Sequence, residues 1–217
     1  TGTITEGKLS VVELATGNVT KFQKLSQVKP ELAADLITGI GINNSASVSK
    51  GDIIGGNSTD RALMAFLVDS KVADSLSKED VRNFNAFDSN KKSSSVTVTR
   101  NGKSVTYIKG APERIIDRCT HYIDENGVEK KLVEKNYLTS YMNEQAGRSM
   151  RLLAVAKCDG VSDEGELTLI CVLSIRDNVR KEAVDAIREV KNAGIQVVMV
   201  TGDRKETAVA IAKEAGL

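Results

Sequence analysis

The sequence predicts an α+β domain, an antiparallel sheet flanked by helices, that is inserted in a partial α/β domain. Two alternating runs, residues 93–100 and 103–109, flank Asn101-Gly102, the strongest short signal of a β-hairpin. Closer to the C-terminus, two apolar runs are each followed by an amphipathic helix pattern, which is typical of a parallel sheet with right-handed crossovers. The two patterns require two kinds of sheet in one chain.

Two loops and a helix are expected before the hairpin. Residues 39–49 and 51–58 are rich in glycine and polar side chains, which favours loops. A helix is expected to begin near Thr59-Asp60, because apolar residues then recur at three- and four-residue spacing.

A second helix and a strand are expected after the hairpin. Pro112 favours a helix start, and this helix is expected to run towards Arg118. Residues 149–157 (SMRLLAVAK) have the pattern of a strand. The middle of the chain therefore supplies the antiparallel sheet and its helices.

The C-terminal region supplies the α/β pattern. Residues 167–175 (LTLICVLSI) form a nearly continuous apolar run, as expected of a strand that is buried on both faces. A helix follows and is expected to end at Gly194, where a left-handed C-cap fits. Residues 195–200 (IQVVMV) predict a second buried strand, and a second amphipathic helix is expected to end at Gly216.

The composition argues against several classes of protein function. The 217 residues carry a net charge of +1, which argues against non-specific binding of nucleic acid. The three cysteines lie far apart and predict reduced, partly buried thiols rather than a zinc site. No run approaches the ~18 apolar residues that span a bilayer. We therefore expect a soluble chain. The first residue is not methionine, so we also expect it to be a piece of a longer protein.

Thr201-Gly202-Asp203 would lie at the carboxyl end of the second parallel strand, where open α/β sheets place their ligands. The turn and the following helix N-terminus would favour an anion such as phosphate. Asp203 is also an obvious N-cap, and capping alone explains a lone motif of this kind more often than ligand binding does.

Lys109-Gly110 and Phe87 are candidate ligand contacts around the hairpin. A lysine at a strand end can point towards a phosphate or a base ring, although a solvated lysine is the commoner case. Phe87 stands in a polar segment and is either a core anchor or a stacking platform for a base. His121 is the only histidine, so a catalytic triad is not expected, and Gly55-Gly56 lacks the spacing of the known phosphate loops.

Taken in order, four motifs resemble the P-type ATPase family of cation transporters. They are the opening TGTIT (residues 1–5), KGAPE (109–113), DNVR (177–180) and TGD (201–203) with the TA that follows. The resemblance implies a nucleotide-binding domain at residues 9–172. Residues 1–8 and 173–217 would be pieces of an incomplete haloacid-dehalogenase-like (Rossmann-like) phosphorylation domain.

The resemblance also implies an ATP site. Phe87 would stack on the adenine, Lys109 would contact it, and Asp60 would lie near its amino group. Arg151 and Leu153 would line the phosphate and ring sides. The residues assigned to nucleotide binding are Asp60, Phe87, Lys92, Lys109, Gly110, Arg151 and Leu153. Ser89 stands where relatives often have an arginine, which implies weaker ATP binding.

A second set of residues matches those around the phosphorylated aspartate of the family. The set is Thr3, Arg180, Thr201, Gly202 and Asp203, and the backbone of Thr3 would contact Mg²⁺ in the parent. The aspartate itself would precede Thr1 by two places. The resemblance therefore implies that this piece binds nucleotide and does not form the phosphoenzyme by itself.

The implied parent couples ATP hydrolysis, through an aspartyl-phosphate, to cation transport across a membrane, and the chain resembles the calcium-pump branch of the family. Its expected partners are ATP or ADP and the remaining phosphorylation, actuator and transmembrane domains, on the cytoplasmic face of the membrane; nucleic acid is not expected. Two alternatives remain open: a haloacid-dehalogenase-superfamily phosphohydrolase with a large cap insertion, and a non-catalytic nucleotide-binding module.

Overall fold

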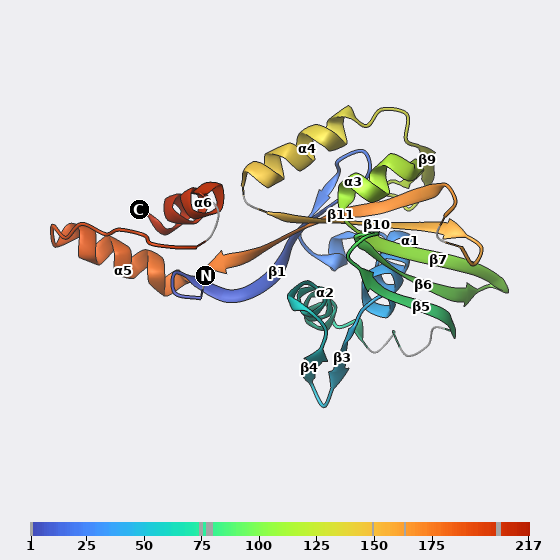
Figure 1. The fold of residues 1–217 in the computed structure, drawn as a ribbon, viewed down its shortest axis with the longest axis horizontal. Helices are drawn as coiled ribbons and strands as arrows, with labels where there is room; N and C mark the ends of the chain where they lie inside the picture. The colour runs from blue at the N-terminus through green and yellow to red at the C-terminus, as the bar shows by residue number, and fades with distance from the viewer. Residues whose placement is uncertain (1, 74–75, 77–79, 149, 163, 203–204) are drawn as a thin grey trace.

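A curved, mainly antiparallel sheet forms the body of the chain in the computed structural model, which describes residues 2–73, 76, 80–148, 150–162, 164–202 and 205–217 (Figure 1). Within these residues the sheet has nine strands, in the order β2-β1-β11-β10-β7-β6-β5, and β8 and β9 extend it beside β11. The strands are β1 (Thr5–Ala15), β2 (Lys21–Phe22), β5 (Asp80–Asp88), β6 (Ser93–Arg100), β7 (Lys103–Gly110), β8 (Cys119–Ile123), β9 (Glu129–Lys131), β10 (Arg151–Asp159) and β11 (Leu167–Val179). Only the β8–β11 pair is parallel among the strand pairs of the described chain.

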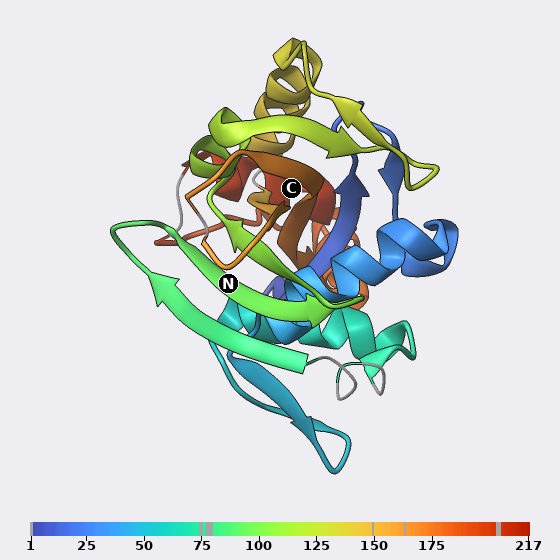
Figure 2. The same ribbon diagram turned by 90° about the vertical axis from the view of Figure 1, so that its right-hand side faces the viewer.

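Helices cover both faces of this sheet (Figures 1 and 2). The α-helices are α1 (Pro30–Ile37), α2 (Ser58–Asp69), α3 (Pro112–Ile115), α4 (Asn136–Gly147), α5 (Lys181–Asn192) and α6 (Lys205–Ala215). Short 3-10 turns lie at Leu25–Gln27 and Ile116–Arg118, and a π-helical turn lies at Thr38–Ile42. α1 and α2 pack on one face, and α3 and α4 pack on the other.

The core consists of two apolar clusters, one on each face of the sheet, and alternating side chains of the β6–β7 hairpin contribute to both. Tyr107 packs on the α2 face with Leu63, whereas Ile108 packs on the α4 face with Leu138. Successive strand residues point to opposite faces, so neighbours in the sequence join different clusters. The predicted hairpin turn is confirmed, since Asn101 and Gly102 both adopt positive φ angles, 51° and 76°.

The prediction of two loops before α2 is only partly right. Residues 39–49 contain most of the π-helical turn and strand β3 (Ala46–Ser49), and β4 (Asp52–Gly55) pairs with β3. This hairpin projects from the body on the α2 side (Figure 2). Lys50 and Gly51 take positive φ angles of 50° and 89°, which form a tight reversal that composition alone did not reveal.

The predicted parallel α/β unit is wrong within the described residues. Residues 195–200 form no strand, and Val198 and Val200 are 70% and 92% exposed. A strand needs a neighbour with a free edge, and β11 is paired with β1 and β10 over most of its length. The two flanking helices do form, and Gly194 and Gly216 follow them with φ angles of 78° and 86°.

The two ends of the chain lie together at one end of the molecule (Figure 1). β1 pairs with the second half of β11, so the segments predicted to be pieces of one domain are adjacent. Both strands run through the predicted boundaries at residues 8/9 and 172/173, and those boundaries remain a prediction. Among the described residues, none of the helices combines the length and the apolar character needed to cross a bilayer.

Candidate functional site

A cavity of about 550 Å³ opens beside the N-terminus of α2 and the ends of β5, β7 and β10. All of the residues assigned to nucleotide binding from the sequence lie in its wall. The lining comprises Asn57, Ser58, Thr59, Asp60, Phe87, Ser89, Lys92, Ser94, Lys109, Gly110, Ala111, Glu113, Arg151, Leu152 and Leu153. The fold therefore brings together the assigned residues, which are up to 93 positions apart, from Asp60 to Leu153.

A buried ion pair lies in the wall of the cavity. Lys109 Nζ is 2.5 Å from Asp60 Oδ1, and the two residues are only 5% and 4% exposed. Burial lowers the pKa of Lys109, and the nearby carboxylate of Asp60 opposes that shift. The pair offers a donor and an acceptor at the edge of a largely apolar space.

The N-cap of α2 fixes the carboxylate of this pair. Asn57 Oδ1 accepts hydrogen bonds from the backbone N–H groups of Thr59 and Asp60, each at 2.9 Å. The Asp60 carboxylate is held through Oδ2, which accepts hydrogen bonds from Asn57 Nδ2 at 3.4 Å and from the backbone N–H of Ser45 at 3.2 Å. Asp60 is thus held from its own helix and from the segment before β3, which leaves its other oxygen to Lys109.

Phe87 lines the cavity and is 55% exposed as a residue. It lies near the end of β5, an edge strand of the sheet. The turn after it is stabilised by Asp88 Oδ1, which accepts hydrogen bonds from the backbone N–H groups of Asn90 and Lys91. These bonds also hold the pKa of Asp88 below its usual value. An exposed phenyl ring at the end of a strand, next to a hydrogen-bonded turn, suits stacking better than core packing.

Gly110 is required by a close approach of two backbone segments. A Cβ atom at this position would lie 2.3 Å from the carbonyl oxygen of Lys92 and 2.8 Å from Cα of Ser93. Lys92 itself has a positive φ of 53°, and its carbonyl accepts the N–H of Ala111 at 3.0 Å. Gly110 and Lys92 therefore shape the cavity wall through the backbone.

Arg151 lies where β10 begins, opposite the first turn of α2. Its Nη1 donates to Thr59 Oγ1 at 2.8 Å, which places the guanidinium group at the helix start. Leu153 lies two residues further along β10, so its side chain is on the same face of the strand.

Several lining residues were not identified from the sequence. Asn57 could have been recognised as an N-cap by its place before the helix. Glu113 is the last residue of KGAPE, and its carboxylate lies 3.8 Å from Lys92 Nζ. Ser94 is 5% exposed, and its hydroxyl has no hydrogen-bond partner among the described residues. Nothing local in the sequence distinguishes Ser94 from the serines beside it.

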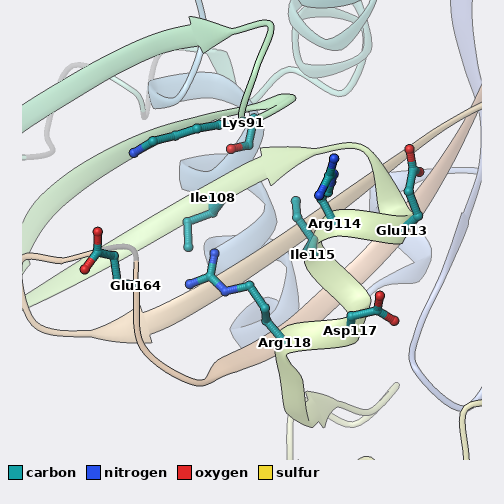
Figure 3. Close-up of a pocket in the computed structure, with 9 residues that line it drawn as sticks. Lys91, Ile108, Glu113, Arg114, Ile115, Asp117, Arg118 and Glu164 are labelled. Atoms are coloured by element: carbon teal, nitrogen blue, oxygen red, sulfur yellow. The ribbon is translucent and has the colours of Figure 1, made fainter.

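A second cavity, of about 530 Å³, lies on the opposite face of the same hairpin (Figure 3). Its wall includes Ser93 of β6 and Ile108 of β7. The next residue of each strand, Ser94 and Lys109, lines the first cavity instead. Charged side chains of both signs surround it, namely Lys91, Glu113, Arg114, Asp117, Arg118 and Glu164. Its described lining includes no aromatic side chain for stacking, so the first cavity is the better candidate site.

The residues predicted to surround a phosphorylated aspartate are only partly brought together. Arg180 Nε donates to the carbonyl oxygen of Thr5 at 2.9 Å, and Nη2 donates to that of Gly2 at 3.2 Å, on either side of Thr3. Thr201 and Gly202 are exposed and lie outside regular structure. Asp203 lies outside the described residues.

The described residues offer no other obvious chemistry. No group of three or more His, Cys, Asp or Glu side chains in this part of the chain could hold a metal ion. Cys119, Cys158 and Cys171 are fully rather than partly buried and form no disulfide with one another, and burial raises the pKa of Cys119 to about 12.

Comparison with known proteins identifies the family. The family model of the P-type ATPase cytoplasmic domain N matches residues 33–182. The chain is 34% identical over 239 residues to calcium-transporting ATPase 7, plasma membrane-type, of Oryza sativa subsp. japonica, an alignment that covers 100% of this chain and 23% of that protein.

Relatives from other organisms also align with the whole of this chain. Plasma membrane calcium-transporting ATPase 4 of Bos taurus is 32% identical over 248 residues, with 100% of this chain and 20% of that protein covered. Calcium-transporting ATPase 1 of Lactococcus lactis is 30% identical over 234 residues, covering 100% and 26%. The chain thus spans about a quarter of the length of these relatives. It belongs to the P-type ATPase family, matches that family's cytoplasmic domain N, and is similar to calcium pumps over its whole length.

Proposed function

We propose that the cavity beside α2 binds ATP, with the adenine ring stacked on Phe87 and its polar edge towards Lys109 and Asp60. The observation that carries the proposal is the pairing of an exposed phenyl ring with a buried ion pair across one largely apolar cavity. Ligand sites commonly combine apolar walls with a few fixed polar groups. Base stacking on an aromatic side chain contributes about 1–3 kcal/mol.

The residues that line this cavity have different roles in the proposed binding. Leu153 contacts the ring, the absence of a side chain at Gly110 keeps the cavity open, and Lys92 and Arg151 lie at its rim for the ribose and phosphates. Mg²⁺ would accompany the phosphates and neutralise their charge in the intact protein. ADP fits the same contacts with one phosphate fewer.

For the whole protein, we propose a pump that couples ATP hydrolysis, through an aspartyl-phosphate, to calcium transport across a membrane. The names of the relatives and the full-length alignment support this assignment. Residues 1–8 and 173–217 would then belong to a haloacid-dehalogenase-like phosphorylation domain on the cytoplasmic face. The bonds from Arg180 to the carbonyls of Gly2 and Thr5 are consistent with that pairing of the two ends.

Calorimetric titration of ATP into wild type and two phenylalanine variants tests the proposed site. Phe87→Ala removes the stacking ring, and we expect roughly a tenfold loss of affinity. Phe84→Ala is the matched control, because Phe84 lies on the same strand, is 40% exposed and does not line the cavity. Equal affinities for the two variants, or no binding by the wild type, would overturn the proposal.

A further inference from the structure

A third cavity, of about 420 Å³, adjoins the proposed nucleotide site. The two cavities share Ser58 and Arg151 in their walls. The third cavity continues from this shared wall towards β1, the end of β11 and α6, where Gly7, Asp177 and Glu214 line it. A ligand that extends from the first cavity past Arg151 therefore enters the third cavity, which reaches Gly7 in β1.

The first cavity has too little positive charge for a polyphosphate. It is lined by Lys92, Lys109 and Arg151. Lys109 is neutralised by Asp60, and Lys92 lies 3.8 Å from the carboxylate of Glu113. Within the described part of the chain, this leaves Arg151 as the one cation of that wall without a carboxylate partner. ATP carries several negative charges, which a single exposed arginine neutralises only in part.

The third cavity supplies a further cation. Its arginines are Arg148, Arg151 and Arg176. Arg176 is neutralised, because its Nη1 and Nη2 donate to the two oxygens of Glu214 at 2.7 and 3.0 Å. Arg148 has no carboxylate within 4.0 Å among the residues that the structure describes. Among the described arginines of this wall, Arg148 and Arg151 are therefore the two whose charge is available to a ligand.

Among the described residues, two carboxylates line the third cavity: Glu214, which is paired with Arg176, and Asp177, which opposes an anion. The two oxygens of Asp177 already accept hydrogen bonds, from Thr5 Oγ1 at 2.7 Å and from the backbone N–H of Gly7 at 2.9 Å. These donors hold Asp177 against the β1 side of the cavity. Arg148 and Arg151 come from the opposite side, where α4 ends and β10 begins.

The backbone of Arg148 is fixed although its side chain is exposed. Arg148 follows the last residue of α4, and its N–H donates to the carbonyl oxygens of Glu144 and Gln145, each at 3.1 Å. A guanidinium group on a fixed backbone can bind phosphate oxygens in a bidentate manner.

We propose that Arg148 binds the phosphate groups of a nucleotide whose base lies in the first cavity. This inference rests on the proposed function and adds to it a phosphate subsite in the third cavity. Arg148 thereby supplies charge that the uncharged Ser89 does not provide at the rim of the first cavity.

The test compares ATP and AMP binding to wild type, Arg148→Gln and Arg148→Lys. We expect Arg148→Gln to weaken ATP binding on the order of fivefold and to leave AMP binding unchanged, because the contact is to the distal phosphates. Arg148→Lys keeps the charge and is expected to recover most of the affinity. Lys213→Gln is the matched control, since Lys213 lines a neighbouring cavity with Arg148 but not the third one.

The outcomes separate this inference from the proposed function. If the wild type binds neither nucleotide, both fail. If the wild type binds ATP and Arg148→Gln binds it equally well, or loses ATP and AMP affinity to the same extent, the phosphate subsite is wrong and the base site stands.

Discussion

The sheet and the two C-terminal helices are stabilised by different kinds of contact. In the sheet, β11 is paired on both edges and buries side chains in apolar clusters on both faces. α6 is joined to β11 by the exposed Arg176–Glu214 pair, and Lys191 of α5 donates to the carbonyl of Gly216 at 2.8 Å. The apolar run at residues 195–200 stays largely exposed between these helices. An apolar run thus becomes a buried strand only where a strand edge is free to pair with it.

The largest loss of stability is expected from breaking the buried Lys109–Asp60 ion pair of the sheet region. Asp60→Ala leaves the Lys109 amine buried without its carboxylate, and we expect the free energy of unfolding to fall by about 3–5 kcal/mol. Urea denaturation followed by circular dichroism measures this change. A loss below about 1 kcal/mol would show that the pair is solvated rather than buried.

A glycine in the cavity wall is expected to have the next largest effect. Gly110→Ala forces a Cβ atom against the Lys92 carbonyl, and a backbone shift of this kind costs about 1–3 kcal/mol. Gly147→Ala is the control, because Gly147 ends α4 and its Cβ would meet no atom within 4 Å. In the same denaturation experiment this control is expected to be neutral or slightly stabilising. Similar losses for the two variants would contradict the close approach at Gly110.

The exposed ion pair of the C-terminal region is expected to contribute least. Glu214→Gln removes the partner of Arg176, whose side chain is 29% exposed against 40% for Glu214. We expect a loss of about 0–1 kcal/mol, with faster amide hydrogen exchange confined to α6. A loss as large as that of Asp60→Ala, or faster exchange throughout the sheet, would mean that the helices are part of one cooperative core with the sheet.

Local sequence signals predicted the elements that depend on local geometry. Asn101-Gly102 forces positive φ angles and identified the hairpin, and Pro112 marked the start of α3. The β3–β4 hairpin was missed, because its turn at Lys50-Gly51 lies in a polar stretch that also suits a loop. Residues 195–200 were misassigned because periodicity does not report whether a pairing partner exists.

Local patterns indicated Lys109, Gly110 and Phe87 as candidate ligand contacts, but the full set of site residues was predictable only through family resemblance. Composition and spacing give no reason to place Asp60 beside Lys109, since 49 positions separate them and the contact arises from α2 packing on the sheet. Ser94 and Arg148 were missed for a related reason. Their surroundings, a cavity wall in each case, exist only after β6, β10 and α4 are assembled.

The most direct test of the account is the face of the sheet on which ATP binds. In a methyl-labelled sample, NMR titration with ATP is expected to shift the methyl signals of Leu153, which lines the first cavity, and to leave those of Ile108 and Ile115 unchanged on the opposite face. Shifts at Ile108 and Ile115 with none at Leu153 would place the nucleotide in the cavity of Figure 3 and contradict the proposed site.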